Sequence, residues 1–238
     1  MQIEELTGNV DASRKGQILQ LINGAKYVRQ IFIWDTVEIT SSTQPGDITM
    51  YSEAVGKGST LFGTGTRNYR DTSFANDGKT NSGEIYILTG MFKNYCQRNF
   101  TGVSAANAGN ITNATKDRID LEDDINDFES GVAGAFPYLE IKMAGDAVFS
   151  RTLLNMIPSL WCWNPHSNMY AANYLPFGKA GALYLDDKTK MTVDLSLAAS
   201  VTLTQPLRLR VCFLGVALKP LDNFSKAKQI ISKLQKVA

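Results

Sequence analysis

The chain has 238 residues, of which 44% are hydrophobic and 20% are charged, close to the averages of folded globular domains. Its 24 basic and 23 acidic side chains leave a net charge of +1, which excludes a global charge bias toward nucleic acid or membranes. No apolar run approaches the ~20 residues of a membrane-spanning helix. We expect one large domain with a sizeable core.

The first residues and the cysteines bear on the compartment. Residues 1–5 lack the positive and apolar regions of a secretory signal, so we expect a soluble protein made in the cytoplasm. Cys96, Cys162 and Cys212 lie far apart, are odd in number and match no CxxC motif or disulfide framework. We therefore expect reduced and mostly buried thiols.

A short helix and a long strand are predicted near the amino terminus. Ser13 can cap a helix that ends before Gly24. Over residues 30–40, apolar residues at odd positions alternate with side chains such as Phe32 and Trp34, which predicts a strand. Because Phe32 and Trp34 are also apolar, we expect the first half of this strand to be covered on both faces.

Two polar segments predict long loops. Residues 56–83 contain six glycines and many Thr, Asn and Asp side chains, which is typical of a surface loop with a function of its own. Residues 99–115 are also polar, and we expect a second loop there.

Further strands are predicted after each of these loops. Residues 84–88 predict a strand, whereas residues 91–99 fit either a strand or a short helix. Residues 138–143 and 147–154, with a tight turn at Gly145 and Asp146, predict a β-hairpin.

An acidic helix is predicted after Thr115, its candidate N-cap, and ends before Gly131. Residues 116–129 carry a net charge of about −5. A solvated face is the simplest interpretation, and the alternative is a contact with a basic surface of a neighbouring subunit. The acidic candidates for this contact are Asp120, Glu122, Asp124 and Asp127.

A basic amphipathic helix is predicted over residues 222–238, with Asp222 and Asn223 as candidate caps. Its net charge of about +3 makes it the natural partner of the acidic helix. The same lysines can contact nucleic acid or an anionic membrane, or only keep the helix soluble. The basic candidates are Lys226, Lys228, Lys233 and Lys236.

Residues 156–177 are rich in aromatic residues and prolines. Because proline cannot donate to a ladder, we expect a connection that packs over one end of the domain and no central strand. Aromatic side chains on loops can stack on sugars, although most Trp and Tyr residues belong to cores. The candidates for such a ligand contact are Tyr69, Trp161 and Trp163.

The sequence contains no recognisable catalytic set. The single histidine, His166, lies four residues after Cys162, but the tryptophans and prolines around it favour a packed loop over a catalytic pair. These two residues do not supply the three or four ligands of a zinc site. We therefore predict no enzyme, no metal, no cofactor and no small-molecule substrate. An enzyme acting through paired carboxylates is the alternative that stays open.

The clearest pattern lies in residues 178–221. Apolar residues occupy every second position of residues 191–197 and of residues 207–213, which is the period of strands with one buried face. We predict that these strands form an antiparallel pair joined by residues 198–206, which buries its apolar face against a second sheet. The predicted fold class is an all-β antiparallel sandwich with peripheral helices.

This region also resembles a known family. Residues 177–185 and residues 206–216, with the alternating strand between them, resemble the last strands of jelly-roll capsid proteins from tailless icosahedral phages, including membrane-containing ones. The resemblance implies a jelly-roll β-sandwich over residues 27–221. Residues 1–26 would then be an N-terminal helical arm and residues 222–238 a C-terminal helix.

The resemblance implies a structural role in a virion. The chain would be a capsid shell subunit that self-assembles with copies of itself and contacts other virion proteins. Its basic C-terminal helix would contact nucleic acid or an inner membrane. The alternative function is a carbohydrate- or receptor-binding sandwich module, such as a virion spike.

Overall fold

The computed structural model describes most of the β domain and a helix at each of three places in the chain. The described residues are 12–40, 43, 45–61, 64–75, 77–97, 124–130, 136–159, 174–177, 182–186, 188–201, 203, 207–220, 227 and 229–230. Among them, no helix is long and apolar enough to cross a bilayer.

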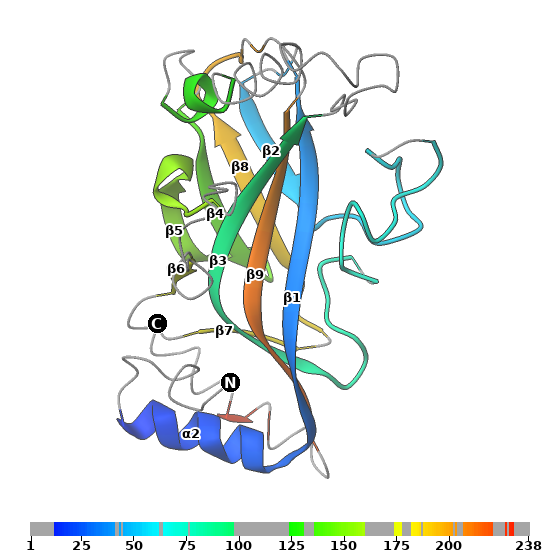
Figure 1. The fold of residues 1–238 in the computed structure, drawn as a ribbon. Coiled ribbons are helices and arrows are strands. Elements are labelled where there is room, and N and C mark those ends of the chain that lie inside the picture. Colours follow the sequence, from blue (N-terminus) through cyan, green and yellow to red (C-terminus); the bar gives the residue numbers. More distant parts are fainter. Residues whose placement is uncertain are drawn as a thin grey trace, which may run out of the picture.

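Two antiparallel sheets pack face to face, which confirms the predicted sandwich (Figure 1). The larger sheet has the order β1-β9-β3-β6, and β7 also pairs with β3. Its strands are β1 (Ala25–Ile39), β3 (Ile85–Gln97), β6 (Leu175–Pro176), β7 (Leu183–Leu185) and β9 (Leu207–Pro220). The smaller sheet has the order β2-β8-β4-β5, and its strands are β2 (Gly46–Met50), β4 (Tyr138–Met143), β5 (Asp146–Leu153) and β8 (Met191–Leu197).

The strand pairing is nested from the ends of the chain inward. β1 pairs with β9, β2 with β8, β3 with β6 and β7, and β4 with β5. The outermost pair lies in the larger sheet, the next in the smaller sheet, and so on in alternation. The chain therefore runs like one long hairpin folded over on itself.

The predicted pairing of the two clearest strands with each other is wrong. β8 lies between β2 and β4 in the smaller sheet, whereas β9 lies between β1 and β3 in the larger sheet. The nine residues between these strands are enough to span the ~10 Å that separates packed sheets. A period of two identifies the buried face of a strand, but it does not identify the neighbour on its edge.

The inward-facing residues of β8 and β9 are buried as predicted. The side chains of Val193, Val211 and Phe213 are fully buried in one large apolar cluster that both sheets share. Aromatic rings add to this core: Tyr51 packs against Phe213 with ring centroids 5.5 Å apart. Burying such side chains is the main favourable term in the stability of the domain.

A second apolar cluster lies on the outer face of the larger sheet. The predicted N-terminal helix is confirmed as α2 (Ala12–Asn23), and its Ile18 and Leu21 are buried there. They pack against side chains of β3 and β9, such as Ile87 and Val216, together with Ala227. α2 lies across one end of the larger sheet and does not extend along the rest of its outer face (Figure 1).

The region that fitted either a strand or a helix is part of β3. The register of β3 on β9 shifts between Leu88 and Gly90. At Gly215 of β9 the two backbones approach so closely that a Cβ would lie 2.1 Å from the Ile87 carbonyl oxygen. Such a contact excludes any side chain, so glycine is required at this position.

The predicted β-hairpin is confirmed as β4 and β5, with its turn one residue earlier than expected. Ala144 and Gly145 form the turn with φ angles of 54° and 96°. Two positive φ angles match the right-handed twist of a hairpin.

Candidate functional site

The long loop between β2 and β3 is the most elaborate feature of the described surface. It leaves one sheet after Met50, runs beside β1 and enters the other sheet at Ile85 (Figure 1). Its described residues form isolated bridges, such as Asp35 with Thr72, and no longer strand. The predicted loop over residues 56–83 is therefore confirmed for the described residues.

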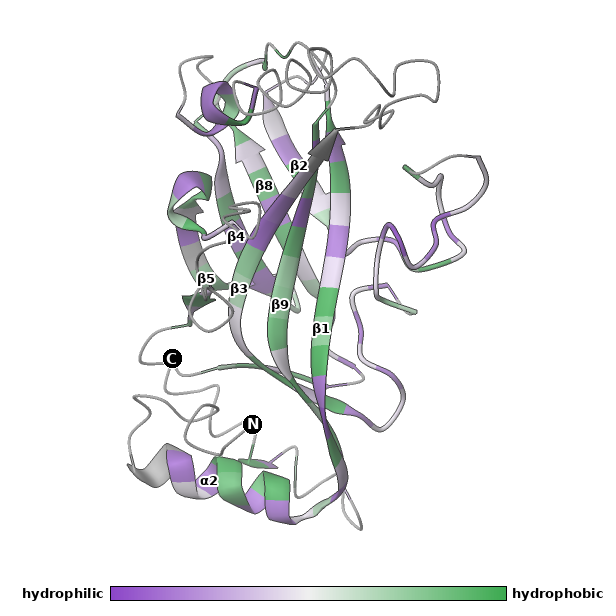
Figure 2. Cartoon of the chain, viewed as in Figure 1, coloured by the Kyte–Doolittle hydropathy of each residue, from purple (hydrophilic) through white to green (hydrophobic). Residues whose placement is uncertain are grey.

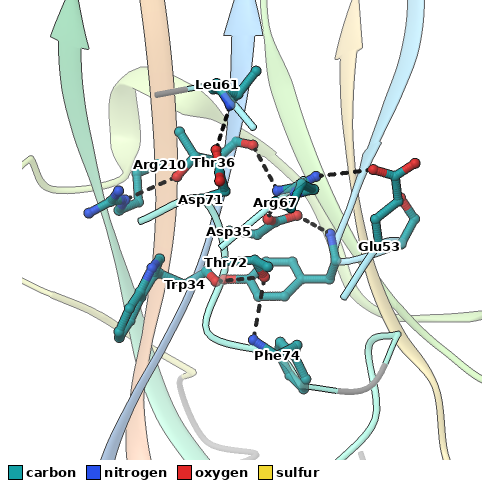
Figure 3. Close-up of polar contacts among 12 residues, drawn as sticks. Trp34, Asp35, Thr36, Glu53, Leu61, Arg67, Asp71, Thr72, Phe74 and Arg210 are labelled. Atoms are coloured by element: carbon teal, nitrogen blue, oxygen red, sulfur yellow. Dashed lines mark hydrogen bonds and ion pairs between the residues drawn. The ribbon is translucent and has the colours of Figure 1, made fainter. Parts of the chain in front are cut away.

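A buried carboxylate in β1 anchors this loop (Figure 3). Asp35 is fully buried, and its carboxylate accepts a hydrogen bond of 2.5 Å from the backbone N–H of Tyr51. The Arg67 guanidinium forms an ion pair with the same carboxylate and donates to the Thr36 carbonyl oxygen at 3.2 Å. Arg67 also lies 3.7 Å from Glu53, so one cation ties three parts of the chain together.

Burial dominates the electrostatics of this anchor. It raises the pKa of Asp35 to about 6, although the Arg67 charge and the Tyr51 N–H act in the opposite direction. Removing one partner of a buried ion pair typically costs about 3–5 kcal/mol because the other charge is left uncompensated. The anchor therefore holds the loop strongly, although it adds little net stability to the fold.

A second carboxylate organises the loop internally. Asp71 is buried and accepts hydrogen bonds from Thr60 Oγ1 at 2.7 Å, Leu61 N at 2.7 Å and Asn68 N at 2.9 Å. Burial raises the pKa of Asp71, but the hydrogen bonds from Asn68, Leu61 and Thr60 outweigh it and lower the pKa below its ordinary value. The loop is thus a built structure with its own polar core.

The loop also covers part of the free edge of β1. Ser73 N donates to the Trp34 carbonyl oxygen at 2.9 Å, and the Trp34 N–H donates to Ser73 Oγ at 2.8 Å. Both backbone groups of Trp34 therefore point away from β9 and are occupied by the loop.

The loop presents one of the three predicted ligand-contact residues. Tyr69 is 64% exposed, beside Arg70, whose carbonyl oxygen accepts a hydrogen bond from Arg210 of β9. Trp161 and Trp163 lie outside the described residues. Only Tyr69 is therefore placed on the surface.

The lower half of β1 is exposed, which corrects the expectation that it would be covered on both faces. Phe32 is 51% exposed and Val28 is 41% exposed. Figure 2 shows strongly hydrophobic colour on this part of β1. The reason is that α2 covers side chains of β3 and β9 and does not extend over the edge strand.

A polar cluster fixes the other face of this part of β1. Glu84 is buried and accepts hydrogen bonds from the Tyr27 hydroxyl at 2.5 Å and from Arg29 at 3.1 Å and 3.2 Å. Burial acts to raise the pKa of Glu84, and the hydrogen bonds from Tyr27, Asn81 and Arg29 act to lower it. The hydrogen bonds have the larger effect together, so the pKa of Glu84 lies below its ordinary value. The Arg29 charge is thereby paired within the chain.

The acidic helix contacts its own subunit in the part that is described. Residues 124–130 are helical, and Glu129 Oε1 lies 2.6 Å from Nζ of Lys93, a buried residue of β3. The same Nζ donates to the Leu154 carbonyl oxygen at 2.6 Å. Burial lowers the pKa of Lys93, and Glu129 offsets part of that shift.

The other predicted contact residues are placed only in part. Asp124 is buried and Asp127 is exposed. The structure does not describe the remaining members, which are Asp120, Glu122, Lys226, Lys228, Lys233 and Lys236. The predicted contact between acidic and basic helices of neighbouring subunits stays a prediction.

Within the described part of the chain, no three His, Cys, Asp or Glu side chains gather as metal ligands. Cys212 is a buried free thiol, and burial raises its pKa to about 12. His166 and Cys162 lie outside the described residues.

Sequence reasoning missed the residues that organise this surface, namely Asp35, Arg67, Asp71, Glu84 and Lys93. A signal existed for two of them: Asp35 and Lys93 occupy inward-facing positions of otherwise apolar strands, in register with Val211. A charged residue at such a position needs a buried partner. The partner itself cannot be read from a local pattern.

No known protein family matches this sequence, and no curated protein matches it.

Proposed function

We propose that the chain is a structural subunit of a virus shell and that its sandwich is a jelly roll. The observation that carries this proposal is the nested strand pairing. If β6 and β7 are counted as one interrupted edge strand opposite β3, eight strands remain, paired first with last and alternating between two sheets. This order is the one expected of a jelly roll, a fold common in viral capsid and lectin domains, and it supports the proposal.

One fold serves several functions, so the character of the surface also bears on the function. The surface supports the proposed shell function. The outer face of the smaller sheet is polar and internally bonded, since Asp194 accepts hydrogen bonds from Thr49 at 2.8 Å and from Lys142 at 2.6 Å. Exposed apolar side chains lie on edge strands of both sheets, namely Val28 and Phe32 on β1 and Val148 and Leu153 on β5. A subunit with a polar outer face and exposed apolar side chains on its edge strands suits lateral packing between copies.

In this proposal the partners are copies of the chain and other virion proteins, and the location is the virion. The basic C-terminal helix would contact nucleic acid or an inner membrane.

The test is self-assembly of the purified full chain. Sedimentation and negative-stain electron microscopy over a range of salt and protein concentrations should show rings, sheets or closed shells of uniform curvature. Val211→Asp, which disrupts the core, separates ordered assembly from aggregation of unfolded protein. A compact monomer at every concentration and ionic strength would reject the shell function.

One observation favours the alternative of a receptor- or carbohydrate-binding module. Tyr69 is exposed on a loop that buried carboxylates hold in place. Exposed tyrosines on rigid loops are effective ligand contacts because little side-chain entropy is lost on binding. Glycan-array binding that is lost in Tyr69→Ala, and retained in Arg70→Ala, would support this module over a shell subunit.

A further inference from the structure

The lower half of β1 has a free backbone edge. In an antiparallel strand, alternate residues direct both N–H and C=O to the same side. Both groups of Trp34 point away from β9, toward Ser73. The register of β1 on β9 is regular from Tyr27 onward, so the groups of Val28, Gln30 and Phe32 point the same way. No hydrogen bond joins them to another residue in the described ranges.

The free stretch has defined ends. Toward the carboxyl end of β1, Ser73 occupies the backbone groups of Trp34 and Arg67 occupies the Thr36 carbonyl oxygen. Toward the amino end, the ladder is irregular between Ala25 and Tyr27. With respect to the described residues, the unoccupied edge is therefore residues 28–32, with Gln30 at its centre.

The side chains on this stretch are suited to a protein contact. Val28, Gln30 and Phe32 project on the same face, and all three are exposed. The charge of Arg29 projects on the opposite face and is paired with Glu84. Edge strands of natural proteins are normally protected by proline, charge or a cover, and an apolar unprotected edge is a template for another strand.

We propose that residues 28–32 pair in antiparallel orientation with the same residues of a second copy, around a two-fold axis at Gln30. Gln30 would then lie opposite Gln30 of the second copy, and Val28 opposite Phe32. Every free N–H and C=O on the edge would gain a partner, and two larger sheets would join into one continuous sheet. Apolar pairs of an aromatic and a β-branched side chain are favourable across strands.

Two features favour the register centred on Gln30 over the registers shifted by one residue: the charge of Arg29 and the backbone groups of Trp34, which are already hydrogen-bonded. Moving the axis to Arg29 would place two arginines directly opposite each other, which is unfavourable. Moving it to Ile31 would place Val28 opposite Trp34, whose backbone groups Ser73 already occupies. The register centred on Gln30 avoids both conflicts.

The contact is small. Five residues cover only about 17 Å of strand, and the buried area falls below the ~1,200 Å² of standard stable interfaces. We expect a weak isolated dimer that becomes stable when each subunit has several neighbours. In this respect the inference rests on the proposed shell function, because it names one surface through which a subunit meets the next.

Cysteine cross-linking tests the register. In a full-length background with Cys96→Ser and Cys162→Ser, Gln30→Cys should form a disulfide-linked dimer under mild oxidation. Residues directly opposite in a hydrogen-bonded pair have Cα atoms ~5.5 Å apart, within the range of disulfides. The matched control is Val28→Cys, whose two copies would lie about 14 Å apart and should not cross-link.

Two results would overturn the contact: no cross-linked dimer of Gln30→Cys at millimolar protein, or equal cross-linking of Val28→Cys. Adding Phe32→Arg to Gln30→Cys should reduce the cross-linking rate about tenfold or more. Val148→Arg is the control for that change, because Val148 is a 39% exposed residue on β5, an edge strand of the other sheet.

The two proposals fail separately. Specific cross-linking of Gln30→Cys without larger assemblies in electron microscopy would leave the two-fold contact standing and reject the shell. Ordered particles that form equally well with Phe32→Arg would support the shell and reject this contact.

Discussion

At the scale of single residues, the described molecule depends on a few buried charges. Asp35 holds the long loop through Arg67 and the Tyr51 backbone, and Lys93 holds the helix at residues 124–130 through Glu129. Each charge sits at an inward position of a core strand. Burial is unfavourable for each charge, and a specific partner offsets part of that cost.

Asp35 gives the protein a particular pH dependence. Its pKa is about 6 in the folded chain and near 3.8 when unperturbed, so between these values the native state holds a proton that the unfolded chain has released. Its contribution to stability therefore increases as the pH falls from 7 to 5, by about 1 kcal/mol. Asp35→Asn removes this titration, because the amide stays neutral at every pH and resembles the protonated carboxyl.

Urea unfolding of the wild type and of Asp35→Asn at each pH checks this sign. The unfolding free energy of the wild type minus that of Asp35→Asn should increase by about 1 kcal/mol from pH 7 to pH 5. A constant value would place the pKa of Asp35 near its ordinary value, and a decrease would mean that Arg67 dominates over burial.

Two glycines provide a matched pair of substitutions. Gly215→Ala brings a methyl group within 2.1 Å of the Ile87 carbonyl oxygen and should cost about 2 kcal/mol or more. Gly16→Ala has no atom within 4 Å of the new methyl group and lies inside α2, so it should stabilise by about 0.5–1 kcal/mol. Thermal unfolding should move the two midpoints in opposite directions. If Gly215→Ala left the midpoint unchanged, β3 and β9 would not pack as closely as described.

At the scale of elements, contacts between residues far apart in the sequence decide which sheet a strand joins. β8 and β9 are separated by only nine residues, yet they have no common sheet. They meet instead through their apolar faces, across the core that contains Val193 and Val211.

The buried face of β9 gives a direct test. Val211→Asp places a charge without a partner in the interior and should prevent cooperative folding. Lys219→Ala lies on the same strand but is exposed, and it should change stability by less than about 0.5 kcal/mol. Circular dichroism and soluble yield distinguish the two outcomes. Equal native yield of both variants would show that Val211 does not face the core.

The link between β3 and the acidic helix is also testable. Lys93→Met leaves Glu129 without its cation and should cost about 3 kcal/mol, whereas the double variant Lys93→Met with Glu129→Met should recover most of that loss. A double-mutant cycle measured by urea unfolding gives the coupling energy. Additive losses would mean that the two side chains do not interact in solution.

At the scale of the whole molecule, nested pairing makes the two ends of the chain mutually dependent. β9 is the shared neighbour of β1 and β3, and Ala25 is paired with Pro220. The larger sheet therefore cannot form until β9, its last strand in the sequence, is present.

A truncation tests this dependence. A chain that ends at residue 203 lacks β9 and should show no cooperative unfolding transition, since β1 and β3 lose the only strand between them. A chain that ends at residue 230 keeps every described strand and should unfold cooperatively. A native-like transition in the shorter chain would contradict the described strand order.

Much of the local structure was predictable from the sequence. α2, the β4–β5 hairpin, the long loop after β2 and the inward faces of β8 and β9 all follow from periodicity, caps and turn residues. Each of these features depends on the order of apolar and polar side chains within a short segment, so it can be predicted from that segment alone.

The tertiary structure alone decided which strands pair and which polar residues meet. The partners of Asp35, Glu84 and Lys93 are separated from them by long or irregular stretches of chain. The lower edge of β1 is free among the described residues because the loop bonds to this edge only near Trp34, and α2 packs on β3 and β9. The physical reason is that a period of two fixes the face of a strand but leaves its two edges chemically alike. Every edge offers the same N–H and C=O groups, so the choice of neighbour depends on how the whole core packs.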